Sequence, residues 1–128
     1  MSQRPVPPAL HELEAEVMDA MWQLERATVR EVMHACNARA DKPRAYTTYM
    51  TIMTRLDTKG LLKRKRDGKT DTYWPRLDRA TYEERRAAAE VEQLVEQFGD
   101  VALVHFARTM DGLDPARARA LRRHARDQ

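Results

Sequence analysis

Five threonines and one arginine recur on one side of a helix that the sequence predicts over residues 47–59. At 100° per residue they occupy an arc of about 120°, and they are Thr47, Thr48, Thr51, Thr54, Arg55 and Thr58. Threonine is a mediocre helix former, so an exposed row of five needs a reason other than helix stability. A threonine hydroxyl exchanges hydrogen bonds with base edges, and its methyl group packs on the thymine methyl. The spacing therefore indicates a helix that reads the major groove of DNA.

The segment after this helix is basic and is predicted to form a β-hairpin. Asp67 and Gly68 give a turn signal between two short extended runs. Residues 42–69 hold nine Lys or Arg against two Asp, and a local excess of this kind suits a polyanionic partner. The hairpin cations are Lys63, Arg64, Lys65, Arg66 and Lys69. Tyr73 and Trp74 alternate along the second strand, so at least one ring should pack beneath the hairpin.

Two further helices are predicted before the threonine-rich helix. Apolar residues recur at three- and four-residue steps from Leu10 to Leu24, which is typical of a helix with one buried face. Thr28 and Glu31 have the spacing of a capping box at the start of a second helix over residues 29–38. Pro43 separates that helix from the third one. The apolar side of the third helix is predicted to hold six residues: Tyr46, Tyr49, Met50, Ile52, Met53 and Leu56.

Three helices followed by a hairpin predict a mainly α-helical fold with a small β-hairpin. This order is that of a winged helix-turn-helix domain, which we place at residues 9–79. A flexible, proline-rich tail is expected over residues 1–8. Residues 80–128 are predicted to be helical, with a second capping box at Thr81 and Glu84.

The composition excludes several other functions. A single cysteine, Cys36, rules out an internal disulfide and fits a reducing compartment. The N-terminal residues lack the apolar core of a signal peptide, and no apolar run approaches a membrane span. No paired carboxylates, nucleophile–base set or metal motif stands out. We therefore expect a cytoplasmic protein without membrane insertion, enzymatic activity, cofactor or metal.

The stretch AYTTYMTIMTRLDTKGLLKRKRDGKTDTYWP, residues 45–75, resembles the BlaI/MecI/CopY family of bacterial repressors. It has the family's A-Y-T-T-x-M-T opening, R-L-x-x-K-G-L helix end, short basic wing and Y-x-P close. LEAEVMDAMWQ, TVREVMHACN and VALVHFARTMDGLDPARARALRR resemble other parts of the family, so the resemblance spans nearly the whole chain. It implies a homodimeric repressor bound to an inverted-repeat operator in double-stranded DNA.

The resemblance also assigns roles to residues. The DNA-binding set comprises Arg44, Tyr46, Thr47, Thr48, Thr51, Arg55, Lys63, Lys65, Arg66 and Lys69. The C-terminal helices correspond to the family's dimerisation region, in agreement with an apolar stripe that a short chain buries best against a second copy. The dimerisation set comprises Val91, Leu94, Val95, Phe98, Leu103 and Phe106.

Two branches of the family differ in how they respond to a signal. Copper-responsive members carry C-terminal Cys-x-Cys pairs, which this chain lacks, so the β-lactam-response branch fits better. In that branch a membrane sensor protease triggers cleavage of the repressor at an Asn-Phe bond. The matching residues here are His105 and Phe106, with histidine in place of asparagine. The residues alone also leave open a ligand-gated winged-helix regulator and a winged-helix adaptor that binds an acidic protein.

Overall fold

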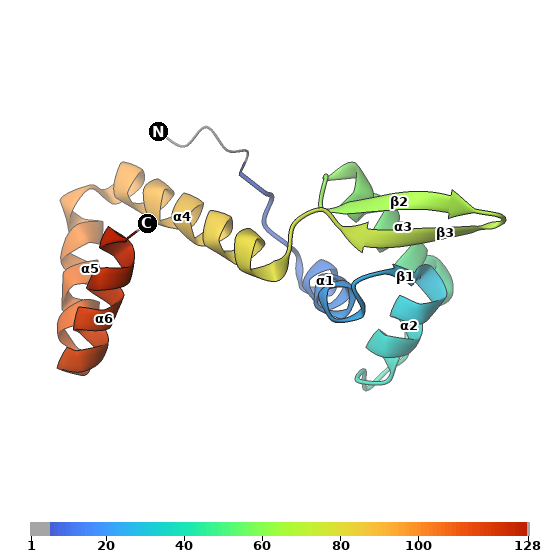
Figure 1. Cartoon of the computed structure of the whole chain (residues 1–128), viewed down its shortest axis with the longest axis horizontal. Helices are drawn as coiled ribbons and strands as arrows, with labels where there is room; N and C mark the ends of the chain where they lie inside the picture. Colours follow the sequence, from blue (N-terminus) through green and yellow to red (C-terminus); the bar gives the residue numbers. More distant parts are fainter. Residues whose placement is uncertain (1–5, 128) are drawn as a thin grey trace. The chain divides into compact units, whose positions relative to one another are not determined.

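The computed structural model describes residues 6–127 and consists of six helices and three short strands within that range. Figure 1 follows them along the chain, in the order α1 Glu12–Leu24, β1 Ala27–Thr28, α2 Val29–Asn37, α3 Tyr46–Thr58, β2 Leu62–Asp67, β3 Thr70–Pro75, α4 Arg79–Phe98, α5 Asp100–Asp111 and α6 Pro115–Arg126. None of these helices is both long and apolar enough to cross a membrane.

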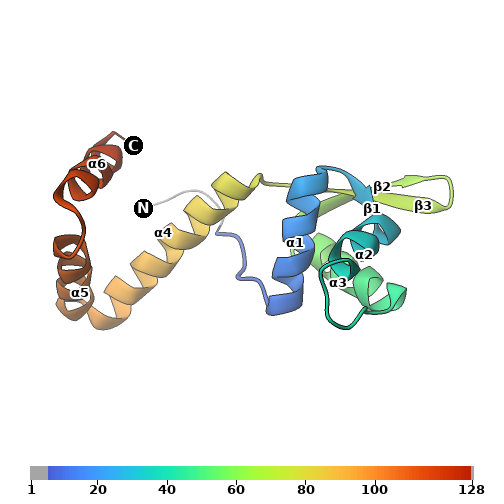
Figure 2. The same cartoon turned by 90° about the horizontal axis from the view of Figure 1, so that it is seen from below.

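The chain divides into two compact units, with the division between Arg86 and Ala87 inside α4. The first unit holds α1, α2 and α3 beside the sheet (Figure 2). The second unit holds the C-terminal half of α4 together with α5 and α6. The functional boundary after residue 79, which the sequence predicts, stays a prediction.

The core of the first unit lies where α1, α2 and α3 meet the sheet. Its largest fully buried side chains come from α1, α3 and the hairpin, and include Met18, Met21, Tyr49, Met53, Leu56, Leu62 and Tyr73. On α3 the core residues recur at three- and four-residue steps, so one face of the helix is buried and the opposite face is left in solvent. Burial of Tyr73 fits the expectation that an aromatic ring packs beneath the hairpin.

Two residues that the helical wheel places on the apolar side of α3 are exposed. Tyr46 is 39% exposed and Met50 is 43% exposed. Both lie at the border of the stripe, because Met50 is about 100° from the centre of the buried face and Tyr46 is the first residue of the helix. The apolar side predicted from the sequence was therefore too broad, and these two side chains belong to the outer surface.

The sheet has three antiparallel strands in the order β1-β3-β2. The two-residue strand β1 was not predicted, and it pairs Ala27 with Tyr73. The hairpin prediction was right, but its turn is shifted by one residue. Asp67 pairs with Thr70, so Gly68 and Lys69 form the two-residue loop. Gly68 has a φ of +66°, which glycine adopts at the first position of such a turn without steric cost.

The helix starts differ in how well the sequence anticipates them. At α2 the predicted capping box is present, since Glu31 N donates to Thr28 Oγ1 at 3.2 Å and Thr28 N donates to Glu31 Oε1 at 2.9 Å. The predicted box at Thr81 and Glu84 is wrong, because α4 already begins at Arg79. Asp78 takes the capping role by accepting the backbone N–H of Thr81 at 2.7 Å, which also lowers the pKa of the Asp78 carboxyl.

The start of α4 is fixed on α1. Trp22 Nε1 donates to the Leu77 carbonyl oxygen at 2.9 Å, and the Trp22 ring lies 5.3 Å from that of Tyr82. Arg79 pairs with Asp19 at 2.8 Å and lies over the Trp22 ring. These contacts hold the end of the winged-helix unit to its first helix.

The predicted flexible tail lies only partly within the described residues. Residues 1–5 are outside them. Pro7 is buried, and the carbonyl oxygens of Pro7 and Pro8 accept hydrogen bonds from Arg86 and Tyr82. Pro7 and Pro8 are thus held by side chains of α4 that lie far away in the sequence, and the flexibility of the tail stays a prediction.

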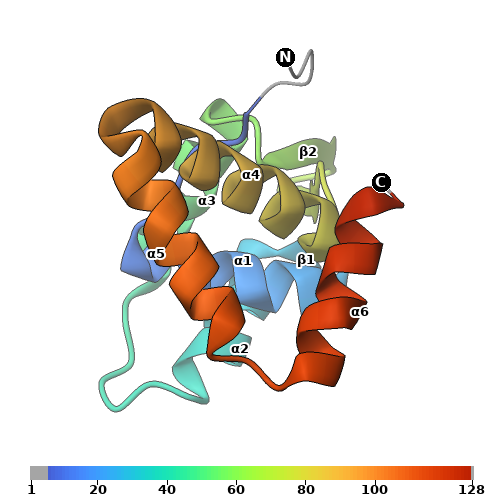
Figure 3. The same cartoon turned by 90° about the vertical axis from the view of Figure 1, so that its left-hand side faces the viewer.

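In the second unit α5 and α6 form a helical hairpin (Figure 3). Asp114 is the N-cap of α6, since its carboxylate accepts the N–H groups of Ala116 and Arg117, and Pro115 occupies the first turn. Ala102 and Ala118 are the only buried residues in the described part of this unit. The unit thus leaves most of its large apolar side chains exposed.

Candidate nucleic-acid interface

The outer face of α3 carries the threonine row that the sequence predicts. Thr47, Thr51, Thr54, Arg55 and Thr58 are exposed, and Thr48 is half-buried. The hydroxyl of Thr58 donates to the Thr54 carbonyl oxygen at 3.1 Å, so it is turned back onto the helix. The other threonines of the row lie on the outer face of α3, and the opposite face of this helix is buried in the core. This is the geometry of a helix that presents one face to a partner.

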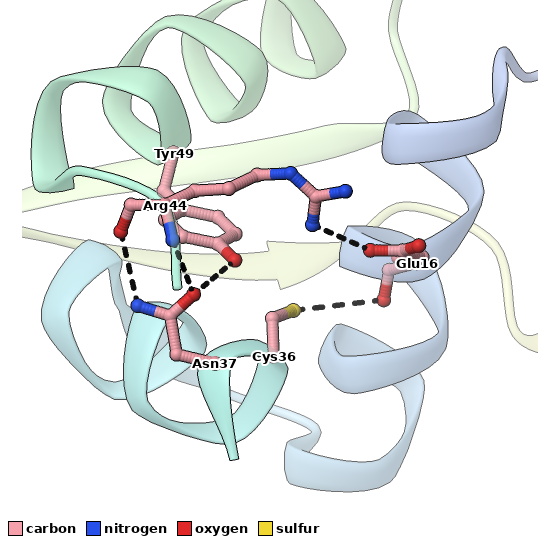
Figure 4. A network of polar contacts seen from close by, with 5 residues as sticks. All are labelled: Glu16, Cys36, Asn37, Arg44 and Tyr49. Atoms are coloured by element: carbon pink, nitrogen blue, oxygen red, sulfur yellow. Dashed lines mark hydrogen bonds and ion pairs between the residues drawn. The ribbon is translucent and has the colours of Figure 1, made fainter. Parts of the chain in front are cut away.

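The start of α3 is positioned by Asn37, the last residue of α2. Its side chain accepts the Arg44 N–H at 3.0 Å and donates to the Arg44 carbonyl oxygen at 3.0 Å. The hydroxyl of the fully buried Tyr49 also donates to Asn37 Oδ1, at 2.7 Å. Figure 4 shows the amide between the α2–α3 connection and the Tyr49 ring. The three bonds tie the connection and α3 to the end of α2.

Arg44, a predicted DNA-binding residue, lies beside the start of α3 but is not free in this structure. Its guanidinium pairs with Glu16 of α1 at 3.1 Å, and both side chains are about two-fifths exposed. Nearby, Cys36 is buried, its thiol faces the Glu16 carbonyl oxygen at 3.9 Å, and burial raises its pKa (Figure 4). The predicted contact of Arg44 with DNA therefore requires its exposed ion pair with Glu16 to break.

The end of α3 is fixed by a buried ion pair that the sequence did not reveal. Lys59 Nζ donates to both carboxylate oxygens of Glu14, at 2.8 and 2.9 Å. The Glu14 side chain is 1% exposed. Burial raises the pKa of the Glu14 carboxyl, but hydrogen bonds from Lys59 and from the His11 N–H outweigh it, so the pKa lies below its ordinary value. Both ends of α3 are thus held by polar contacts to the helices before it.

The hairpin separates its cations onto two faces. Arg64 lies opposite Tyr73 and Arg66 opposite Asp71, whereas Lys63 and Lys65 lie on the other face. Arg64 pairs with Asp57 of α3 at 3.3 Å, and Arg66 pairs with Asp71 at 3.7 Å. The arginines therefore share their charge with carboxylates.

The three lysines of the hairpin are the uncompensated cations. Lys63, Lys65 and Lys69 are exposed, and none of them forms an ion pair within residues 6–127. Lys63 and Lys65 lie on the same face of β2, and Lys69 is at the turn. The hairpin members of the predicted DNA-binding set are thus three lysines without an ion pair in the described residues and Arg66, whose side chain is 67% exposed but partly neutralised.

Two arginines that the sequence analysis missed extend this basic surface. Arg30, in the first turn of α2, lies over the ring of Tyr46 at 5.4 Å. Arg26 lies over the ring of Trp74 at 4.7 Å. A cation over an aromatic face is stabilising, so this contact favours the exposed position of the Tyr46 ring. No local motif marks these pairs, because their members are 16 and 48 residues apart in the sequence.

The predicted dimerisation residues lie on the second unit and are largely exposed. Leu94 is 40%, Leu103 48% and Phe98 52% exposed, while Val91 is also exposed and Val95 and Phe106 are half-buried. His105 and Phe106 lie in the middle of α5, and the His105 carbonyl oxygen accepts the Thr109 hydroxyl at 2.9 Å. The candidate scissile bond is therefore helical rather than extended.

Three helices with a β-hairpin wing and an exposed, threonine-rich third helix define a winged helix-turn-helix domain. The family model described as "Penicillinase repressor" matches residues 10–126, and the chain belongs to this family. A protein named "Transcriptional regulator BlaI", from two strains of Mycobacterium tuberculosis, is 41% identical over 114 residues, which cover 85% of this chain and 78% of the relative.

A solved structure supports the same fold. The solution structure of the DNA binding domain of the repressor BlaI matches with a TM-score of 0.51 and 25% identity, over 62% of this chain and 94% of that one. The resemblance and the fold class predicted from the sequence are thus confirmed. The chain is a transcriptional repressor and not an enzyme.

Proposed function

We propose that this chain acts as a homodimer on an inverted-repeat operator, with α3 in the major groove and the wing on the phosphate backbone. The observation that carries the proposal is the outer face of α3, where a row of threonines is exposed while both helix ends are held by Asn37 and Lys59. A rigid, correctly placed helix loses little freedom when it enters a groove. As an operator-binding protein it works in the cytoplasm, where the chromosome lies.

The two kinds of side chain divide the work. Thr47, Thr48, Thr51 and Arg55 contact base edges, since they lie on the face of α3 that is turned to solvent. The phosphate contacts come from the start of α3 and from the wing, through Arg44, Tyr46, Lys63, Lys65, Arg66 and Lys69. Because the three lysines have no carboxylate partner in the described residues, they keep their full charge for phosphates.

Dimerisation uses the second unit. Its exposed apolar residues, Val91, Leu94, Phe98 and Leu103, form a surface that a single copy does not bury. Val95 and Phe106 complete this surface, to which a second copy supplies the missing cover. A dimer binds two half-sites at once, and linked binding raises affinity far above that of either half.

Derepression follows from cleavage at His105–Phe106 by a membrane sensor protease. The bond lies inside α5, so the protease acts when this helix opens locally. Cleavage separates the rest of α5 and all of α6 from the DNA-binding unit. The dimer is then lost and the operator is vacated.

Binding stoichiometry tests the proposal. Duplexes from the DNA upstream of the protein's own gene are titrated in fluorescence anisotropy, as a complete inverted repeat, a single half-site and a shuffled control. We expect two chains to bind each inverted repeat and the half-site to bind more weakly. At moderate salt the shuffled duplex should show little binding, because only nonspecific contacts remain. Equal affinity for all three duplexes would contradict the proposed function.

A further inference from the structure

The second unit separates its charges by helix. The part of α4 that belongs to it, residues 87–98, contains three glutamates and no Lys or Arg. Helix α6 contains five arginines and no carboxylate between Pro115 and Arg126. This is a much sharper segregation than a solvated surface requires, because mixed charges serve solubility equally well.

Two of these glutamates and three of these arginines are exposed and form no ion pair among the described residues. Glu92 and Glu96 border one edge of the apolar stripe of α4, and Arg119, Arg122 and Arg126 share one side of α6. Within the described part of the chain, none of these five side chains takes part in an ion pair. Opposite charges thus coexist in one compact unit without meeting each other.

The spacing of the two sets matches. Glu92 and Glu96 are four residues apart, and so are Arg122 and Arg126. Four helical residues span about 6 Å, so both pairs present their charges at the same interval along the helix axis. The two carboxylates can therefore meet the two guanidiniums of another helix in one register.

We infer that in the dimer the acidic row of α4, Glu92 and Glu96, pairs with the arginine row of α6 on a second copy of this chain. This inference rests on the dimer proposed above and specifies its chemistry. A twofold axis makes every such contact occur twice, so one acidic and one basic row per copy are self-complementary. Pairing α4 with α4 instead would bring glutamates together and cost stability.

The apolar stripe provides most of the affinity of the dimer, and the charged rows determine which helix of the second copy is contacted. Val91, Leu94 and Phe98 lie beside the row of Glu92 and Glu96 and lose exposed surface on docking. Charges at the rim of such a surface mainly set orientation and specificity. Reversal of the charges on α4 or α6 should therefore change which copies of the chain pair with each other.

Charge reversal on each helix tests the pairing. One variant carries Glu92→Arg and Glu96→Arg, and a second carries Arg122→Glu and Arg126→Glu. Each variant alone should dimerise at least roughly tenfold more weakly than the parent chain in sedimentation equilibrium, because like charges meet twice. An equimolar mixture should recover the parent affinity, since both contacts of the heterodimer are again opposite in sign. The homodimer with all four substitutions should recover it too.

The experiment also includes a control variant and a measurement of operator affinity. Arg117→Glu alters the opposite side of α6 and should leave dimerisation unchanged. If neither the mixture nor the fourfold variant recovers dimerisation while the parent chain is dimeric, the pairing is wrong although the dimer stands. If Arg122→Glu with Arg126→Glu dimerises normally but loses operator affinity, α6 binds DNA and the inference is overturned. A monomeric parent chain would contradict the proposed dimer itself.

Discussion

At the scale of single residues, the proposed DNA surface depends on which polar groups have partners inside the protein. Arg64 and Arg66 share their charge with carboxylates, whereas Lys65 is exposed and has no ion pair among the described residues. Thr51 lies in the middle of the exposed face of α3. The sequence predicted this division of α3 well, because the helical period fixes which residues share a face.

Substitution of Thr51 and of Lys65 separates base reading from phosphate anchoring. Thr51→Ala should reduce discrimination between operator and mismatched duplex by about 1–3 kcal/mol. Lys65→Ala should weaken binding to every duplex alike and reduce the slope of log K against log salt by about one. Both are measured by anisotropy titration at several salt concentrations, with Arg117→Glu as a control outside the winged-helix unit. Identical effects of Thr51→Ala and Lys65→Ala on all duplexes would refute the assigned roles.

At the scale of elements, the structure shows which signals are local and which are not. The capping box at Thr28 and the break at Pro43 act on neighbouring residues, and both helix ends were predicted from the sequence. Strand β1 was missed because two residues become a strand only by pairing with β3, some 45 residues later in the chain. The roles of Asn37 and Glu14 were missed for the same reason, since their partners come from other elements.

Asn37 should affect DNA binding without touching DNA. Asn37→Ala removes three hydrogen bonds and leaves the buried Tyr49 hydroxyl and the Arg44 N–H without their partner. We expect the free energy of unfolding to fall by about 1–3 kcal/mol and operator affinity to fall for all sequences together. Urea unfolding followed by the fluorescence of Trp22 and Trp74, both in the first unit, measures the stability change. Full stability of Asn37→Ala would show that this amide does not position α3.

The ion pair between Glu14 and Lys59 should make stability depend on pH. Lys59→Met leaves a buried carboxylate without its partner and should lower the free energy of unfolding by about 3–5 kcal/mol at pH 7. The exposed pair of Arg44 with Glu16 is the control, and Arg44→Met should cost less than about 1 kcal/mol.

The direction of the pH dependence follows from the lowered pKa of Glu14. As the pH falls, Glu14 is protonated first in the unfolded chain. The stabilisation by the ion pair with Lys59 is therefore complete above the unfolded-state pKa of about 4.3, and it is lost as the pH falls through the lower folded-state pKa. The difference in stability between the parent chain and Lys59→Met should therefore shrink below about pH 4. A difference that stays constant from pH 7 to pH 3 would mean that the pair does not stabilise the fold.

At the scale of the whole molecule, the chain combines a well-packed unit with one that is incompletely buried. The first unit has a continuous core around α3, while the second leaves Leu94, Phe98 and Leu103 in solvent. The sequence predicted an apolar stripe on α4 and, through the family resemblance, a second copy that covers it, and this second copy stays a prediction because no local period encodes a partner. This contrast supports the proposed division between a unit that reads DNA and a unit that assembles the dimer.

Truncation at the candidate scissile bond should separate the two functions. A fragment ending at His105 keeps the whole first unit and loses half of α5 and all of α6. We expect it to be monomeric in sedimentation experiments and to bind the inverted repeat about 100-fold or more weakly than the full chain, while half-site affinity is nearly unchanged. If the fragment dimerises and binds the operator as tightly as the full chain, cleavage at this bond cannot relieve repression.

The central claim, that a dimer reads an inverted repeat through α3, is tested most directly by DNase footprinting of the DNA upstream of the protein's own gene. The experiment is repeated over a series of salt concentrations. The account predicts two protected half-sites related by a twofold axis, appearing together as protein is added and weakening steeply with salt. Protection that is uniform along the DNA, or absent at low salt, would contradict it.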